Sequence, residues 1–244
     1  MGAPTRVATV VLDLDGTLSV GAAPLRRYAR DIAERLPSDA RAAFTRAAEA
    51  HISGEVRLPG ADDWQVLAAL ARASGIAHAA LAAAFQSTRA AMRDGTCLVC
   101  SPHGTARFLA EARAYALIAV VSNSPADSVG PVLARLGLEE LVDAVAPSAQ
   151  KPDGLVPTVR ALVLAHGMSE RPVLSVGDNA QNDILPARAA GWRTAYVRAG
   201  RPACAAATWS GDGLEELMAP ILAWLMRLKA GEEGAALSAG DRAE

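Results

Sequence analysis

The sequence has little lysine and asparagine for its length of 244 residues. Of its 24 lysine and arginine residues, only Lys151 and Lys229 are lysine, and asparagine occurs only at Asn123, Asn179 and Asn182. A composition that avoids two residue types indicates a coding bias. Where such a sequence still uses a disfavoured residue, chemistry is a better explanation than chance, and four of these five positions fall in the polar segments described below.

Several other features are missing, and each excludes a class of protein. Three cysteines are too few for a disulfide framework and lack the spacing of a zinc site. A net charge of -2 leaves no excess positive charge for a nucleic-acid backbone. The sequence has no apolar run of membrane-spanning length, and Met1–Val7 lacks the layout of a signal peptide. We therefore expect a cytoplasmic protein without nucleic-acid or membrane partners.

Short apolar, β-branched runs alternate along much of the chain with helix-length amphipathic stretches. Such runs are typical of strands that are buried on both faces of a parallel sheet. The alternation predicts an α/β fold with a doubly wound, Rossmann-like parallel sheet, which binds ligands at the carboxyl ends of its strands. The predicted strands cover residues 7–12, 116–121, 143–146, 173–176 and 194–197, and glycines that suit helix ends follow at 137, 167 and 191.

Between residues 20 and 100 the pattern changes to helices alone. This stretch predicts a small α-helical cap domain inserted into the core, which comprises residues 1–19 and 101–230. Residues 231–244 are small, polar and aperiodic, which is typical of a disordered tail. The predicted cap helices cover residues 25–36, 40–52, 62–73 and 77–92.

A polar segment follows each of four predicted strands. Each segment alone is ordinary turn or helix-cap chemistry. Because the four segments follow four strands of one parallel sheet, together they bring acids, hydroxyls, an amide and an ammonium group to one edge of that sheet. The segments are Asp13-Leu-Asp15-Gly16-Thr17, Ser122-Asn123-Ser124, Lys151-Pro152 and Gly177-Asp178-Asn179-Ala180-Gln181-Asn182-Asp183.

This set of residues suits phosphoryl transfer. A phosphomonoester needs a nucleophile, an acid for its leaving group and a cation that offsets the repulsion between anions. Asp13 can attack as a carboxylate, and the turn at Gly16 can aim Asp15 toward the leaving oxygen. Oxygen ligands from Asp13 and Asp178 suit Mg²⁺, and Lys151 can hold neighbouring negative charges together. The candidate donors to the phosphoryl oxygens are Thr17, Ser122 and backbone N–H groups.

The four segments, in this order, resemble the motifs of the haloacid dehalogenase superfamily of phosphatases. The helical insert resembles the mobile cap that follows the first motif in C1-type members, such as phosphoglycolate phosphatases. The resemblance implies Asp13 as nucleophile, Asp15 as general acid and base, and Lys151 as the residue that stabilises charge. It implies Mg²⁺ held by Asp13, Asp15, Asp178 and Asp183, and a phosphoryl group bound by Thr17, Ser122, Asn123 and Lys151.

The predicted function is a Mg²⁺-dependent phosphomonoesterase that acts on a small phosphorylated metabolite. The candidate substrates are sugar phosphates, nucleotides and phosphorylated precursors of secondary metabolites. Two alternatives remain, a sugar phosphomutase with the same chemistry and a non-catalytic module that binds Mg²⁺ and phosphate. Dehalogenation needs no leaving-group acid, and Schiff-base phosphonate cleavage needs a lysine that the cap lacks.

In the cap, Trp64 and Arg57 are candidates for substrate selection, with Arg57 facing a second anionic group. The oligomeric state is not predicted.

Overall fold

A six-stranded parallel sheet forms the centre of the computed structural model, which describes residues 6–58, 62–168 and 171–231. The strand order is β3-β2-β1-β4-β5-β6, so the chain moves outward from β1 in one direction and then returns to build the other half. This confirms the predicted doubly wound sheet. The strands are β1 (Ala8–Leu12), β2 (Ala116–Val121), β3 (Ala144–Ala146), β4 (Val173–Gly177), β5 (Arg193–Val197) and β6 (Trp209–Gly211).

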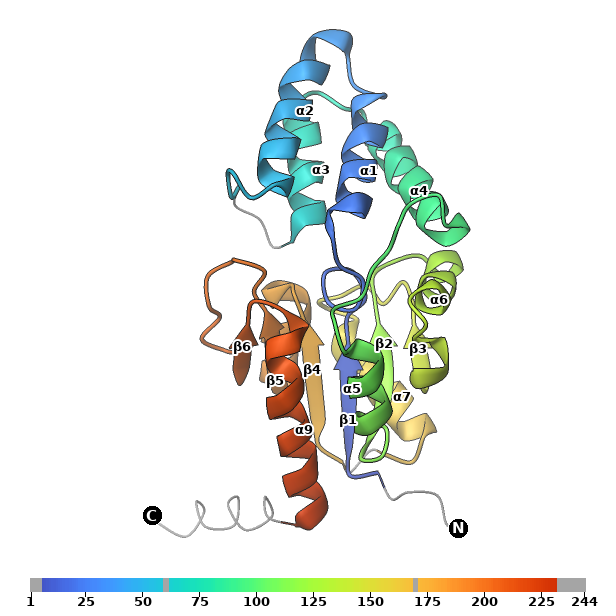
Figure 1. Cartoon of the computed structure of the whole chain (residues 1–244), viewed down its shortest axis with the longest axis vertical. Helices are drawn as coiled ribbons and strands as arrows, with labels where there is room; N and C mark the ends of the chain where they lie inside the picture. The colour runs from blue at the N-terminus through green and yellow to red at the C-terminus, as the bar shows by residue number, and fades with distance from the viewer. Residues whose placement is uncertain (1–5, 59–61, 169–170, 232–244) are drawn as a thin grey trace.

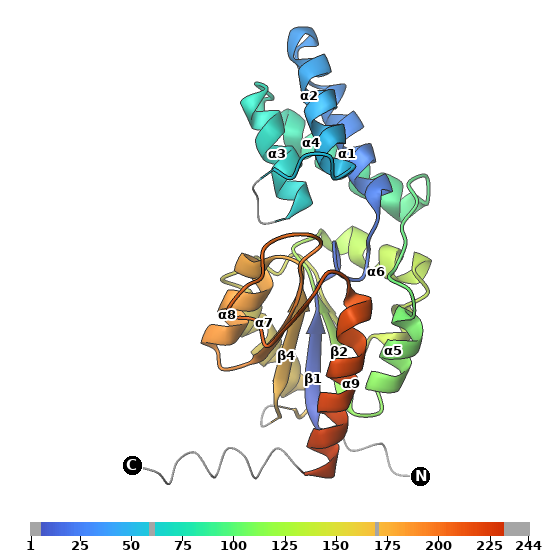
Figure 2. The ribbon, with the colours of Figure 1, turned by 60° about the vertical axis from the view of Figure 1, so that its left-hand side comes forward.

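Helices cover both faces of the sheet, as Figure 2 shows. Alternate residues of β1 serve the two faces, because Val10 and Leu12 belong to one apolar cluster and Val11 to another. This double burial explains the continuous apolar run of the strand. The first cluster includes α5 (Thr105–Ala112), α6 (Ala126–Arg135) and α9 (Leu214–Ala230), and the second includes α7 (Leu155–Ala165) and α8 (Leu185–Ala189).

Four helices, which we call the cap, lie beyond the carboxyl ends of the strands (Figure 1). They pack around an apolar cluster of their own that includes Tyr28, Phe44 and Leu67. The chain enters the cap near Val20 and leaves it near Cys100. A hydrogen bond joins these two connecting segments, in which Val20 N donates to Cys100 O at 2.8 Å. The cap helices are α1 (Ala22–Ala33), α2 (Ser38–Ile52), α3 (Asp63–Ala73) and α4 (His78–Asp94).

Some elements differ from the sequence prediction. Helix α1 begins at Ala22 rather than at residue 25, because a proline at position 24 is well tolerated in a first helical turn. Strand β6 was not predicted, since three residues at the sheet edge carry too little pattern. The predicted disordered tail lies outside the described residues, apart from Gly231. Across the described ranges, no helix is long and apolar enough to cross a membrane. Short helical turns occur at Glu139–Leu141 (η1) and Ala180–Ile184 (η2).

Candidate active site

The carboxyl ends of β1 and β4 place two aspartates side by side. Leu12 and Val176 are register partners in the parallel pair, and Asp13 N donates to Val176 O at 2.9 Å. Asp13 and Asp178 follow these strand ends directly. The strand order reverses between β1 and β4, and ligands of open α/β sheets bind at such a reversal.

Two glycines allow the acidic residues to crowd together. Gly16 has φ of 91°, a left-handed conformation that favours glycine, and a Cβ atom there would collide with the carboxylate of Asp178. A Cβ atom at Gly177 would collide with the side chain of Asp183. The turn predicted at Gly16 is therefore present, and glycine is required at both positions for steric reasons.

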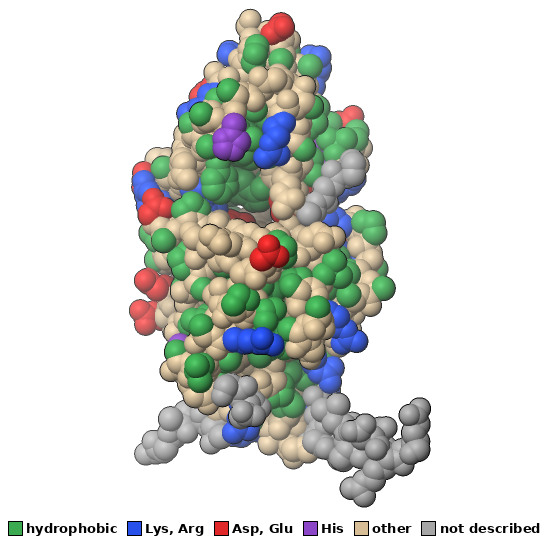
Figure 3. Space-filling view, turned by 180° about the vertical axis from the view of Figure 1, so that it is seen from behind, with side chains coloured by type: hydrophobic (Ala, Val, Ile, Leu, Met, Phe, Trp, Pro, Cys, Tyr) green, Lys and Arg blue, Asp and Glu red, His purple; other side chains and the backbone are tan. Residues whose placement is uncertain are grey.

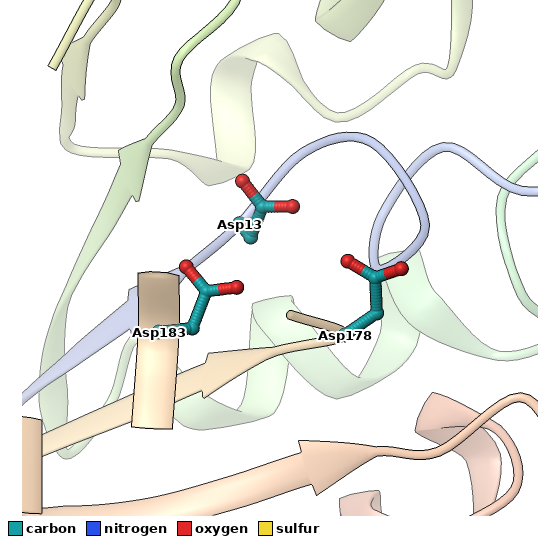
Figure 4. A group of neighbouring side chains, drawn as sticks. All are labelled: Asp13, Asp178 and Asp183. Atoms are coloured by element: carbon teal, nitrogen blue, oxygen red, sulfur yellow. The ribbon is translucent and has the colours of Figure 1, made fainter. Parts of the chain in front are cut away.

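Three carboxylates form a cluster that can hold a metal ion. Asp13, Asp178 and Asp183 each offer an oxygen within 4.8 Å of the others, and Figure 4 shows the three side chains gathered at the strand ends. Lys151 Nζ donates to Asp13 Oδ1 at 2.7 Å and to Asp183 Oδ1 at 2.6 Å. One ammonium group therefore pairs with two of the three buried carboxylates, whereas Asp178 has a longer contact of 3.4 Å with Arg201.

The pKa values in this cluster reflect burial and mutual repulsion. Burial raises the pKa of Asp13 to about 7. The positive charge of Lys151 lowers this pKa, and the negative charge of Asp183 raises it. Burial also raises the pKa of Asp178 well above its ordinary value, with Asp13 adding to the effect, and burial raises the pKa of Asp183. Burial opposes the charge of Lys151, but Asp13 and Asp183 outweigh it and raise the pKa of the lysine. Repelling carboxylate oxygens at this spacing fit a divalent cation such as Mg²⁺.

Asp15 is held between the cap and the core. Its Oδ1 accepts from Arg89 Nη1 at 2.7 Å, and its Oδ2 accepts from Ser124 Oγ at 2.5 Å. Arg89 comes from α4, is 1% exposed, and also donates from Nε and Nη2 to Ser128 Oγ. Arg89 could not be singled out from sequence, because an arginine in an alanine-rich helix is usually a surface residue.

The other predicted phosphate-binding residues have different surroundings. Ser122 is buried, and its Oγ accepts from Ser124 N at 3.0 Å. Asn123 exchanges two hydrogen bonds with the backbone of Lys151, at 2.7 and 3.0 Å, so it fixes the loop that carries the lysine. Thr17 is fully buried, its hydroxyl has no hydrogen-bond partner among the described residues, and it does not line the cavity described next. Its contact with a phosphoryl group stays a prediction.

A cavity of about 190 Å³ joins these groups to the cap. The molecule is hollowed between cap and core, as Figure 3 shows from behind. All four of the lysine and asparagine residues that fall in the polar segments line this cavity. From the core come Asp13, Asp15, Ser122, Asn123, Ser124, Lys151, Asp178, Asn179, Asn182 and Asp183, and from the cap side come Asp62, Trp64, Gln65 and Phe85.

Asn179 connects the cavity to the cap. Its Oδ1 accepts from the backbone N–H groups of Gln181 and Asn182, so Asn179 caps the helical turn η2. Its Nδ2 donates to Asp62 Oδ2 at 2.7 Å, and Asp62 in turn caps α3 by accepting from Gln65 N at 2.8 Å. The start of α3 is therefore fixed to the loop that carries Asp178.

Arg57 faces a second cavity instead of the carboxylate cluster. Its Nη1 lies 3.6 Å from Asp63 Oδ1, which His51 Nε2 also approaches at 3.3 Å. Arg201, from the loop after β5, donates to the same oxygen at 2.8 Å and to Asp178 Oδ2 at 3.4 Å. The suggestion that Arg57 meets a second anionic group of the substrate is therefore not supported, because its partner is Asp63.

Known structures share this architecture. The putative HAD-hydrolase YfnB from Bacillus subtilis, bound to magnesium, is 20% identical with a TM-score of 0.60, and the match covers 87% of this chain and 97% of YfnB. A predicted phosphoglycolate phosphatase from Haemophilus somnus 129PT is 20% identical with a TM-score of 0.59, covering 89% and 99%. The L-2-haloacid dehalogenase RSc1362 is 18% identical with a TM-score of 0.53, covering 88% and 98%.

At these identities the structural matches show the fold, and they include a predicted phosphatase as well as a dehalogenase. No curated protein sequence matches the chain. A family model, in contrast, matches residues 7–191, a range that spans most of the sheet, the cap and all four polar segments. The chain belongs to the family of haloacid dehalogenase-like hydrolases.

Proposed function

We propose that the protein is a Mg²⁺-dependent phosphomonoesterase that forms a covalent phosphoryl intermediate on Asp13. One observation carries this proposal. A single small cavity brings together a carboxylate at a strand end, a second carboxylate two residues later, a buried lysine and an acidic cluster that fits a divalent cation. These are the parts that hydrolysis of a phosphate ester requires.

In the first step the Asp13 carboxylate attacks phosphorus, and the bond from phosphorus to the ester oxygen breaks. Asp15 gives its proton to that oxygen, so the alcohol leaves uncharged. Arg89 binds Oδ1 of Asp15 and so fixes the direction of the side chain, whereas Oδ2, whose partner is the rotatable hydroxyl of Ser124, can carry the proton. Mg²⁺ bound by Asp13, Asp178 and Asp183 would offset the negative charge that gathers as the two anions meet.

In the second step water attacks the phosphoryl group on Asp13, and Asp15 accepts the proton that the water loses. Inorganic phosphate then leaves, and both aspartates return to their starting states. Lys151 keeps Asp13 and Asp183 in place throughout, through hydrogen bonds of 2.7 and 2.6 Å. Ser122 and Asn123 both line the cavity: the Ser122 hydroxyl serves as a donor to the phosphoryl oxygens, and Asn123 holds the backbone of Lys151 beside them.

Dehalogenation fits these residues less well. A halide leaves a carbon atom without taking up a proton, so Asp15 would have no task as an acid. Attack on neutral carbon also gives no reason to crowd Asp178 and Asp183 around the nucleophile. A phosphomutase remains a second candidate, since it would use the same Asp13 and Asp15 and differ in what accepts the phosphoryl group.

The decisive experiment measures phosphate release from a panel of phosphomonoesters, with Mg²⁺ or with a chelator. We expect Mg²⁺-dependent release by the native protein and a loss of about 10⁴-fold or more in Asp13→Asn, because an amide is a poor nucleophile. Asp127→Asn changes an exposed acid of α6 and serves as the matched control. Absence of release from every ester by folded, Mg²⁺-bound protein would refute the phosphatase and favour the mutase or a binding module.

A further inference from the structure

The charge around the cavity is strongly one-sided. Among the described residues that line it, Lys151 is the sole cation, and its ammonium group already binds two carboxylates. The guanidinium groups of Arg89 and Arg201 lie close by, but each is engaged with carboxylates. The acidic side chains that line the cavity are Asp13, Asp15, Asp62, Asp178 and Asp183.

The cap contributes a different kind of surface. Trp64 and Phe85 line the cavity with their rings edge to face, 5.8 Å apart at 82°. Tyr28 contacts both, with ring centroids 5.3 Å from Trp64 and 6.0 Å from Phe85. These contacts hold the two rings in fixed positions, so the cap presents a firm aromatic wall opposite the nucleophile. Gln65 adds an uncharged hydrogen-bonding group beside them.

From this we infer the substrate class, on the basis of the function proposed above. We propose that the site selects small phosphomonoesters whose leaving group carries a flat apolar ring, and that it rejects esters with a second anionic group. A ring would pack on Trp64 and Phe85. A second carboxylate or phosphate in the leaving group would lose its water, meet no unpaired cation and face several carboxylates.

The size of the cavity narrows the class further. At about 190 Å³ it is smaller than the clefts of about 300 to 1,000 Å³ that bind drug-sized ligands. A phosphoryl group with one ring suits this volume, and a larger leaving group would have to extend into the adjoining cavity that shares Asp15, Trp64 and Asp178. Arg57 lines a separate cavity and does not line this one.

The first test compares esters that differ in one group. We expect kcat/KM for benzyl phosphate to exceed that for 4-carboxybenzyl phosphate by about tenfold or more. Ethyl phosphate and phosphoglycolate form a second pair, in which ethyl phosphate should be preferred. Equal rates within the pairs, or a preference for either charged ester, would overturn the inference while leaving the phosphatase intact. No release from any ester would instead remove the proposed function itself.

A gain-of-function variant tests the same inference without relying on a loss of activity. Gln65→Lys places an ammonium group on the cap wall, and we expect it to raise the ratio of 4-carboxybenzyl to benzyl phosphate kcat/KM by about tenfold. Ala69→Lys adds the same charge one turn along α3, at an exposed position that does not line the cavity, and should leave the ratio unchanged. An equal change in both variants, or none in Gln65→Lys, would contradict the inference.

Discussion

The sheet edge and the cap are built from different kinds of interaction, charged at the edge and apolar in the cap. The edge gathers buried carboxylates around one lysine, and burial raises the pKa values of three of its aspartates. The cap has an apolar cluster of its own and reaches the site through a few side chains, chiefly Asp62, Trp64, Phe85 and Arg89. This difference indicates a division of tasks in which the edge holds the reacting groups and the cap shapes the space for the leaving group.

After the loss of the Asp13 nucleophile, the largest effect that we expect on catalysis comes from the lysine at the edge. Lys151→Ala removes the cation between Asp13 and Asp183 and should lower kcat for phosphate release by about 10³-fold, because the buried negative charge is left uncompensated. Lys229→Ala changes the other lysine of the chain, which is exposed on α9, and should leave kcat unchanged. Similar losses in both variants would show that the position of the cation does not matter.

Two buried phenylalanines test whether the cap and the sheet have separate cores. Phe44 belongs to the cap cluster and Phe108 to the sheet cluster, and replacement of either by alanine should cost about 3 to 5 kcal/mol of local or global stability. Hydrogen exchange should show faster opening of α1 to α4 in Phe44→Ala, with the strands still protected. In Phe108→Ala the strands should lose protection. The same exchange pattern in both variants would contradict independent cores.

Arg89 is the cap residue that directly contacts the proposed general acid, Asp15. Arg89→Met removes one of the two partners of Asp15, and we expect kcat/KM to fall by roughly 10- to 100-fold for alkyl phosphates. With p-nitrophenyl phosphate the fall in kcat/KM, which reports the first step alone, should be much smaller, because that leaving group departs without a proton. A purely structural role would lower both rates equally. Arg93→Met, one turn along α4, is the control, since Arg93 pairs with Asp94 and Asp127 at the surface.

The sheet edge could be predicted from sequence because its residues follow strands directly. A strand buried on both faces leaves a clear apolar run, and the residue after it must lie at the carboxyl edge, as Asp13 and Asp178 do. The cap contacts could not be predicted in this way. Arg89 and Arg57 are both arginines of the cap, yet one is buried against Asp15 and the other pairs with Asp63. Only the packing of helices against the core decides between such partners.

Arg201 lies where the two regions meet, and it offers the smallest and most specific test. Its guanidinium reaches Asp63 of the cap at 2.8 Å and Asp178 of the carboxylate cluster at 3.4 Å. A cation beside a carboxylate of the cluster opposes the binding of a second cation, so Arg201→Ala should tighten Mg²⁺ binding by about threefold to tenfold at low ionic strength.

Isothermal titration calorimetry with Mg²⁺ measures this change without any turnover. Arg198→Ala is the control, because Arg198 pairs with Asp212 outside the cluster. If Arg201→Ala instead binds Mg²⁺ more weakly, Arg201 must act mainly by orienting Asp178, and the cap would then support the metal ligands as well as shaping the leaving-group space. Tighter binding would keep the two regions distinct, with Arg201 as a cation of the core that Asp63 of the cap holds beside the cluster.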